Sequence, residues 1–547
     1  MHVVTLPKSL RIRAYFLPFI AAAVLVAVFN VPFWERFVLA TGGVQIDKLP
    51  LLACTFLMLT LAFGAALSVL NAPRIMKPVL VLLFMISAVV SYFMNEYGIQ
   101  IDKSMVQNVV ETDPGEAWEL LNWRMLVTVA LFGVLPSALL ARTQIQYDAP
   151  ARHIATTALV IAAATALALV ILFVFFKSYA PAVRGHRELR FLLTPTNYIQ
   201  AVNGYVRQRL SKPSVIAPLG RDASKGPVWR EGKQRAITVI VVGETARAMN
   251  FSLNGYPRIT NPLLSQRRDL INFTDVASCG TATAVSLPCL FSVMDREDFN
   301  DSRARSQEGL LDVLKHAGLD VVWRNNNSGC KGACDRVTYQ DLSKPSGESK
   351  YCTNDECYDE RLLEDLPELV RSTKKDMVIV LHQKGSHGPA YWKRYPSDFE
   401  QFAPVCKTNA LEQCTREQIA ATYDNTILYT DYFLDKTISL LERIAREDGA
   451  ATSMLYVSDH GESLGEKNMY LHGAPYLISP PEQRKVPMLM WFSSDFEKRF
   501  KVSRTCLSLR AKQPLSHDNV FHSVLGMLHI STVARNPRLD IFNACRS

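Results

Sequence analysis

The sequence predicts a protein of two parts: a bundle of α-helical membrane spans, followed by a soluble α/β domain with a mostly parallel sheet. Nearly all long apolar runs of the 547 residues lie before residue 177. After residue 235, β-branched runs alternate with helical patterns, which is typical of a sheet covered by helices. We therefore expect a membrane domain over residues 1–176, an amphipathic juxtamembrane segment and linker over 177–235, and a soluble domain over 236–547.

Five apolar runs have about the 20-residue length that spans a bilayer: Ala14–Trp34, Leu49–Leu70, Pro78–Met94, Met125–Ala141 and Ile154–Phe176. Pro136 favours a kink in the fourth run. No small-residue cleavage pattern follows the first run, so we expect a permanent anchor instead of a removed signal peptide.

The loop charges predict the orientation of the spans. With the N-terminus inside, the outer loops carry four basic residues and the inner segments carry seven: Lys8, Arg11, Arg13, Arg74, Lys77, Arg142 and Arg152. Five crossings then place everything after residue 176 outside, which is the periplasm of a Gram-negative cell. Residues 177–235 hold 12 basic and 3 acidic side chains. Beside a span, such a stretch favours the anionic lipids of the inner membrane over nucleic acid.

Ten of the 11 cysteines lie after residue 278. An even number confined to one region is typical of disulfides in an oxidising compartment. Pairing of near neighbours, with the last pair by elimination, gives Cys279–Cys289, Cys330–Cys334, Cys352–Cys357, Cys406–Cys414 and Cys506–Cys545. The alternative is zinc binding through the second and third of these pairs, although no His pair follows them at zinc-finger spacing.

Carboxylates and imidazoles follow the predicted strands. The strands are Ile237–Val242, Leu319–Trp323, Met377–Leu381 and Met454–Val457. The polar residues after them are Glu244, His382, His387, Asp459, His460 and Glu462, with His472 a short way on. Because ligands in such sheets lie beyond the carboxyl ends of strands, we expect these side chains to converge. Their chemistry suits zinc, with manganese as the second choice.

A hydroxyl lies in the stretch Asp275–Cys289. Gly280 permits a tight turn, and the small residues after Thr281 can continue as a helix. A helix N-terminus favours anions such as phosphate, and a nearby metal would activate the weakly nucleophilic hydroxyl. The alternative is that Thr281 only caps the helix. Lys331 also has two interpretations: it holds a phosphate, or it belongs to a turn.

Five segments together resemble the lipid A phosphoethanolamine transferases, which include the mobile colistin-resistance enzymes: Gly243–Arg258, Ser278–Cys289, Cys330–Arg336, Gly385–Pro389 and Ser458–Glu462. The resemblance covers the whole chain and implies an alkaline-phosphatase/sulfatase-like fold. It implies Zn2+ held by Glu244, Thr281, Asp459 and His460, with Thr281 as the nucleophile. It implies a second zinc or substrate at His387 and His472, and substrate contacts at Asn327, Lys331 and Glu462.

The resemblance implies transfer of phosphoethanolamine from phosphatidylethanolamine to a phosphate of lipid A through a covalent phosphoethanolamine-threonine intermediate. The added amine lowers the negative surface charge, so polymyxin should bind less well. We expect a monomeric, multi-pass inner-membrane protein whose residues 236–547 form a periplasmic catalytic domain. The alternatives are a phosphoethanolamine transferase acting on a lipopolysaccharide core sugar, a polymer-modifying transferase, and a non-catalytic lipid A-binding sensor. A sulfatase is disfavoured, because the Cys-x-Pro-x-Arg segment that sulfatases modify is absent around Thr281.

Overall fold

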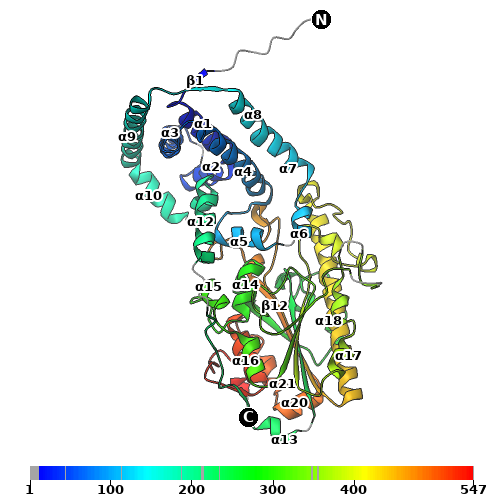
Figure 1. Ribbon diagram of the computed structural model, residues 1–547. Coiled ribbons are helices and arrows are strands. Elements are labelled where there is room, and N and C mark those ends of the chain that lie inside the picture. Colours follow the sequence, from blue (N-terminus) through cyan, green and yellow to red (C-terminus); the bar gives the residue numbers. More distant parts are fainter. Residues whose placement is uncertain are drawn as a thin grey trace. The chain divides into compact units, whose positions relative to one another are not determined.

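The computed structural model describes residues 11–545 except 44, 113, 187, 211–214, 233, 346–348 and 354–355 (Figure 1). Lys8 and the start of the predicted linker therefore lie outside the described residues. The chain divides into two compact units. The membrane unit comprises Met1–Val106 and Leu121–Asn203, and the sheet unit comprises Gln107–Leu120 and Gly204–Ser547. The second stretch of the sheet unit begins within the predicted juxtamembrane segment.

Four helical stretches are long and apolar enough to cross a membrane: Ile46–Ser68, Met76–Tyr97, Trp123–Arg142 and Pro150–Val174. They contain α3 (Leu49–Ser68), α4 (Met76–Tyr97), α7 (Trp123–Thr128), α8 (Leu135–Arg142) and α9 (Pro150–Val174). A π-helical turn, Val129–Val134, joins α7 to α8. It lies directly before the Leu135-Pro136 start of α8, where proline cannot donate to an ordinary helical hydrogen bond. Four of the five predicted spans are thus confirmed.

The first predicted run, Ala14–Trp34, is not one continuous helix, although its helices can together form a fifth, broken span. It is a pair, α1 (Leu17–Val28) and α2 (Val31–Ala40), bent by 69°. The buried Asn30 lies at the break, where its amide donates to the carbonyls of Leu25 and Thr194. Its side-chain oxygen accepts the Thr194 N–H at 2.7 Å. These bonds satisfy a polar side chain inside an apolar region, and they pin the bend.

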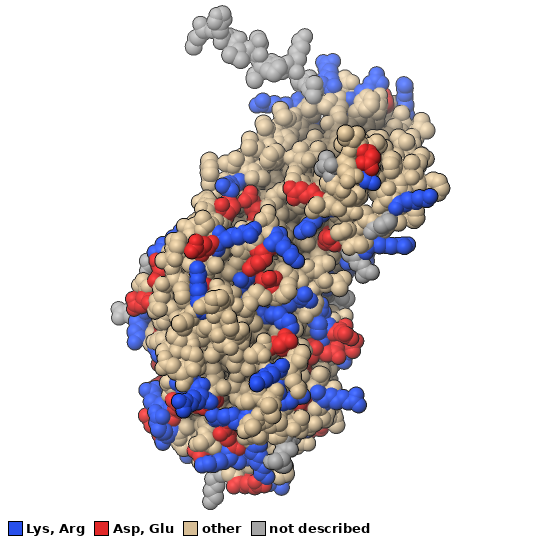
Figure 2. Space-filling model, turned by 180° about the vertical axis from the view of Figure 1, so that it is seen from behind, with Lys and Arg blue, Asp and Glu red and all other residues tan. Residues whose placement is uncertain are grey.

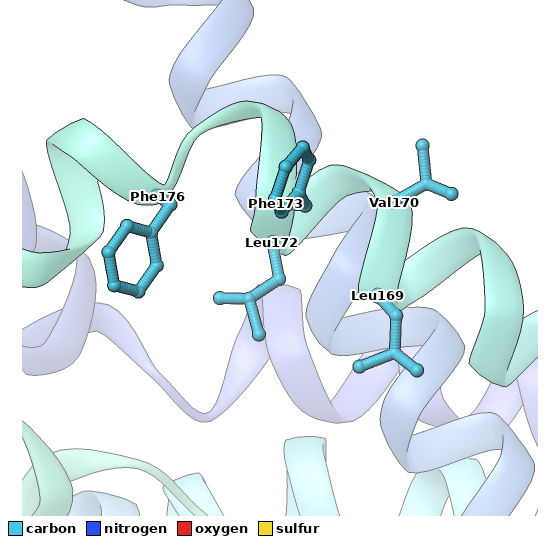
Figure 3. Close-up of a pocket in the computed structure, with 5 residues that line it drawn as sticks. All are labelled: Leu169, Val170, Leu172, Phe173 and Phe176. Atoms are coloured by element: carbon cyan, nitrogen blue, oxygen red, sulfur yellow. The ribbon is translucent and has the colours of Figure 1, made fainter.

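The surface of the membrane unit is largely uncharged on the face shown in Figure 2, whereas acidic and basic side chains are scattered over the sheet unit. Figure 3 shows a hollow where α9 ends and α10 (Phe176–Gly185) begins, lined by Leu169, Val170, Leu172, Phe173 and Phe176. Phe173 is 84% exposed there. Such an apolar surface suits lipid chains. Two more helices follow, α11 (Leu189–Leu192) and α12 (Thr196–Leu210), and the second stretch of the sheet unit begins within α12.

The long loop after α4 forms two helices, α5 (Lys103–Glu111) and α6 (Pro114–Glu119). Its residues Gln107–Leu120 belong to the sheet unit. The Glu111 carboxylate pairs with Arg305 at 3.1 Å, and Glu119 pairs with Arg394 at 2.5 Å. This part of the loop is therefore bonded to the rest of the sheet unit.

An eight-stranded sheet in the order β13-β5-β12-β9-β4-β8-β6-β7 forms the centre of the sheet unit. Its strands are β4 (Ala236–Gly243), β5 (Ile271–Ala277), β6 (Asp320–Asn325), β7 (Thr338–Asp341), β8 (Met377–His382), β9 (Ala451–Ser458), β12 (Lys485–Phe492) and β13 (Leu515–Ser516). Only β12 runs antiparallel to its neighbours among these strands. All eight residues of the central strand β4 are buried, as expected for a parallel strand with both faces covered.

Helices cover both faces of this sheet. Figure 1 shows α17 (Leu366–Arg371) and α18 (Arg416–Asp448) on one side, and α14 (Thr283–Leu290) and α16 (Leu310–His316) on the other. Smaller elements near the C-terminus include α20 (Ser494–Phe500), α21 (Arg504–Arg510) and α22 (Asp518–Met527). The predicted mostly parallel α/β domain is confirmed. All five predicted disulfides are present, and Cys54 is a free thiol.

Candidate functional site

Three buried side chains meet where two neighbouring strands end. Glu244 follows β4, and Asp459 and His460 follow β9, the strand paired in parallel with β4. All three are fully buried. His460 Nε2 lies 3.3 Å from Glu244 Oε1 and 3.4 Å from Asp459 Oδ2. The convergence predicted from strand ends is therefore present.

The Glu244 carboxylate is held by hydroxyl and amide donors. Thr245 Oγ1 donates to its Oε1 at 2.6 Å, and Asn327 Nδ2 donates to its Oε2 at 2.8 Å. Thr283, the first residue of α14, has its hydroxyl 3.1 Å from both carboxylate oxygens and 3.2 Å from His460 Nε2. Thr283 was not singled out from the sequence, although it stands two residues after Thr281.

The donor set fits a metal ion. One ligand atom from each of Glu244, Asp459 and His460 lies within 4.8 Å of the other two. The buried Asp459 Oδ2 has no hydrogen-bond partner, a costly arrangement unless a ligand satisfies it. His460 Nδ1 is 2.9 Å from the Gly461 carbonyl, which fixes the ring and turns Nε2 toward the two carboxylates. Such a contact to the far ring nitrogen is typical of metal-ligating histidines.

The site electrostatics agree with this assignment. Burial alone raises the pKa of a carboxyl, but the hydrogen bond and charge of His460 outweigh it and hold the pKa of Glu244 well below its usual value. Burial, followed by the charge of Glu244, raises the pKa of Asp459. Burial lowers the pKa of His460, but the nearby carboxylates raise it more. Two carboxyl groups are thus held close together in a buried site. A divalent cation would neutralise their negative charge.

Thr281 stands two residues before Thr283, on the segment that leads into α14. The helix begins at Thr283, and its N-cap residue, Ala282, makes no side-chain capping bond. The Thr281 hydroxyl instead donates to the Ala474 carbonyl at 2.6 Å, so the alternative that it caps the helix is wrong. Its role as nucleophile and metal ligand remains a prediction. The Cys279–Cys289 disulfide closes the segment that carries it.

The residues predicted at a second metal or substrate position also lie together. The ring centroids of His387 and His472 are 5.4 Å apart, and those of His460 and His472 are 4.4 Å apart. Glu462 is fully buried and accepts from His472 Nδ1 at 2.8 Å and from the Tyr391 hydroxyl at 2.6 Å. Glu462 therefore orients His472. Tyr391 is a further site residue that the sequence did not reveal.

Known proteins resemble the chain over its full length. Residues 59–210 match the family model for phosphoethanolamine transferase EptA/EptB, and residues 236–530 match the sulfatase model. The chain is 40% identical over 544 residues to phosphoethanolamine transferase EptA of Escherichia coli strain K12, covering 98% of each chain. It belongs to the phosphoethanolamine transferase family. It is also 39% identical over 442 residues to phosphatidylethanolamine transferase Mcr-1 of Escherichia coli, covering 78% of this chain and 81% of that protein.

A solved structure shows the likeness in three dimensions, the membrane unit included. Integral membrane protein lipooligosaccharide phosphoethanolamine transferase A (EptA) of Neisseria meningitidis matches with a TM-score of 0.93 and 35% identity, covering 98% of this chain and 99% of that one. This phosphoethanolamine transferase is accordingly a multi-pass membrane protein with a sulfatase-like periplasmic domain. The predicted family, fold and location are confirmed.

The transferase also has a polar pocket at a predicted substrate residue. Lys331 Nζ donates to the Glu111 carbonyl at 2.9 Å and to Ser328 Oγ at 3.1 Å. With Arg305 and Arg209 it lines a pocket of about 430 Å³. Glu111 and Asp335 line it too, and Glu111 pairs with Arg305, so the pocket offers a phosphate both basic and acidic side chains. His382 is linked to the cluster through Asn327: its Nδ1 is 2.9 Å from Asn325 Oδ1, and its Nε2 is 3.4 Å from the Asn327 Nδ2 that donates to Glu244.

Proposed function

We propose that this phosphoethanolamine transferase moves phosphoethanolamine from phosphatidylethanolamine to a phosphate of lipid A through Thr281. The observation that carries the proposal is the buried Glu244–Asp459–His460 cluster, in which one carboxylate oxygen accepts no hydrogen bond and which contacts Thr283, two residues after Thr281. Family membership supplies the transferred group, and the resemblance supplies the donor and acceptor. The acceptor lipid A phosphate is favoured over a core sugar by the resemblance alone.

Glu244, Asp459 and His460 would hold one zinc ion with Thr281, and His387 and His472 would face a second zinc or the substrate. Bound zinc supplies positive charge that lowers the cost of a Thr281 alkoxide and of the developing negative charge on phosphorus oxygens. Asn327 and Thr283 keep the Glu244 carboxylate in place through their hydrogen bonds. Lys331 adds a positive charge for the phosphate, and Glu462 holds the His472 ring.

The reaction has two balanced halves. In the first, Thr281 Oγ1 forms a bond to the donor phosphorus as the bond from phosphorus to the glycerol oxygen breaks. Diacylglycerol leaves with one proton, which balances the proton lost by Thr281. In the second, an oxygen of a lipid A phosphate bonds to the same phosphorus, the bond to Thr281 breaks, and the hydroxyl regains a proton. Positioning and charge stabilisation account for most catalysis in such transfers.

The outcome on the cell is a less negative lipid A surface. Each transfer adds a primary amine, so polymyxin and other cationic peptides lose electrostatic attraction. The protein would work as a monomer within the inner membrane, where both lipids are found. A non-catalytic sensor would not need the Glu244–Asp459–His460 cluster or the Thr281 segment.

The test follows the covalent adduct. Purified full-length protein with zinc and phosphatidylethanolamine, but without acceptor, should release diacylglycerol and gain phosphoethanolamine on the peptide that contains Thr281. Thr281→Ala should fold and yet do neither. Lipid A from cells carrying each version should be modified only with the original. Full transfer by Thr281→Ala would show that the covalent step is wrong and would leave direct transfer between the lipids.

A further inference from the structure

The loop Leu471–Ala474 adopts an unusual backbone beside the proposed nucleophile. Leu471 has φ of 62° and Gly473 has φ of 89°, with His472 between them. A left-handed conformation is accessible to glycine but unfavourable for leucine. Residues in such conformations persist only where their surroundings hold them. Something in the fold must therefore hold this loop.

The same loop holds Thr281 at two points. The Gly473 N–H donates to the Thr281 carbonyl at 2.7 Å, and the Thr281 hydroxyl donates to the Ala474 carbonyl at 2.6 Å. The first bond fixes the backbone of Thr281, and the second fixes its side chain. The position of the hydroxyl thus depends on the conformation of a loop almost 200 residues further along the chain.

Gln483 spans this loop with its side-chain amide. Its Oε1 accepts the Ala474 N–H at 3.1 Å, and its Nε2 donates to the Leu471 carbonyl at 3.1 Å and to Ser463 Oγ at 2.9 Å. Gln483 is 2% exposed. Its own carbonyl accepts the N–H of Gly461, the residue after His460, at 3.1 Å. The side-chain amide of Gln483 thus ties both ends of the loop together. Its backbone carbonyl ties them to the residue after His460.

We propose that Gln483 is a positioning residue for the transfer reaction, which sets the place of the Thr281 hydroxyl and of His472 through the loop Leu471–Ala474. The inference rests on the proposed function for its consequence in catalysis. Without the amide, the Leu471 carbonyl and the Ala474 N–H lose buried partners, and Leu471 can relax toward negative φ. The Ala474 carbonyl and Gly473 N–H then shift, and Thr281 shifts with them.

The test compares three variants of the full-length protein. Gln483→Met keeps the length of the side chain but removes all three bonds. Gln483→Glu keeps an acceptor for the Ala474 N–H but loses the donor to the Leu471 carbonyl. The control is Asn425→Leu, because Asn425 is also a fully buried amide that clamps a loop. It accepts from Gln401 N at 3.0 Å and Phe402 N at 2.8 Å, away from the site.

The first readout needs no activity: hydrogen–deuterium exchange in peptides covering residues 471–475 and 279–284. Exchange at the Gly473 amide, whose acceptor is Thr281, should become at least about tenfold faster in Gln483→Met and stay unchanged in Asn425→Leu. Unchanged protection of this amide in Gln483→Met would overturn the proposal, whether or not the protein proves to be the proposed transferase.

The second readout is the rate of adduct formation on Thr281. A misplacement of about 1 Å can cost about 100-fold in rate, so we expect kcat for diacylglycerol release to fall at least about tenfold in Gln483→Met. Gln483→Glu should fall between Gln483→Met and the original. The KM for phosphatidylethanolamine and the zinc content should change little. A kcat equal to that of Asn425→Leu would overturn the catalytic part. Absence of any adduct in the original protein would instead overturn the proposed function.

Discussion

Replacing Asp459 with Asn separates the metal-binding role of the cluster from its contribution to folding. Glu244 and Asp459 are fully buried, and both face the imidazole of His460. The substitution keeps the shape of the side chain but removes one negative charge and one ligand oxygen. With the charge of Asp459 removed, the pKa of His460 falls, and the neutral ring, with its proton on Nδ1 toward the Gly461 carbonyl, can accept at Nε2 from the new amide in the place of Oδ2, 3.4 Å away. The metal-free variant should therefore be at least as stable as the metal-free original.

The expected size of the effect follows from mass action. A ligand at 100 to 1,000 times its Kd adds about 2.7–4.1 kcal/mol to the free energy of unfolding. For a domain of this type, that corresponds to a rise in Tm on the order of 5–10 °C. Asp459→Asn should lose nearly all of this rise. In the metal-free state, the free energy of unfolding of Asp459→Asn should exceed that of the original by about 1–3 kcal/mol, the usual cost of a buried polar atom without a hydrogen bond.

Thermal unfolding of the purified full-length protein, with a chelator and with buffered zinc, measures both terms. Asp312→Asn is the matched control, because Asp312 is a buried carboxylate that pairs with Arg336 at 2.7 Å. That control should lower Tm with and without zinc by the same amount and keep the zinc-induced rise. A zinc-induced rise in Asp459→Asn as large as in the original would refute the assignment of Asp459 as a ligand.

Three further predictions rest on single contacts. Thr283→Val should weaken zinc binding about 10- to 100-fold, as loss of a bond that orients a metal ligand typically does, whereas Thr283→Ser should not; competition with a chromogenic chelator measures this. Replacing Cys279 and Cys289 together by Ser should cost about 2–3 kcal/mol of stability, given their separation of 10 residues, as read from chemical denaturation. Burial, and then the charge of Arg535, lowers the pKa of His522 to about 4. Because that pKa is below the unfolded value, stability from the neutral ring is complete above about pH 6.5 and is lost as the pH falls through 4; His522→Asn should flatten this loss in unfolding curves at stepped pH.

The central strands could be predicted because their residues satisfy one simple rule. In β4, every position is buried, so its β-branched run carries a clear signal. In β12, Pro487 interrupts the sequence pattern, and the pairing with β5 shifts register between Val486 and Met488. A proline at a bulge is compatible with a strand but masks it in the sequence. Similarly, Asn30 is one polar residue in a long apolar run, and its effect depends on the distant Thr194.

The site residues also differ in whether a local sequence pattern predicts them. Glu244, Asp459 and His460 follow strands directly, so their meeting could be predicted from their place at the carboxyl ends of strands. Thr283, Tyr391 and Gln483 act through contacts with segments far away in the sequence, which no local pattern encodes. The hydrogen bonds of such side chains depend on backbone conformations set by tertiary packing.

The contact of the Thr281 hydroxyl leads to a requirement on the reaction. Its partner, the Ala474 carbonyl, accepts the hydrogen bond at 2.6 Å but is too weak a base to take the proton. In the proposed reaction, attack of Thr281 on phosphorus therefore requires the hydroxyl to exchange this bond for a contact with groups that lower its pKa. The Thr283 hydroxyl, two residues on, already touches Glu244 and His460, so a rotation about the Thr281 side-chain torsion is a small movement compared with moving the backbone. The loop Leu471–Ala474 would then hold the backbone of Thr281 through Gly473 while its side chain turns. The loop therefore makes two separate hydrogen bonds with Thr281. The bond to its carbonyl holds the backbone, and the bond from its hydroxyl can be exchanged.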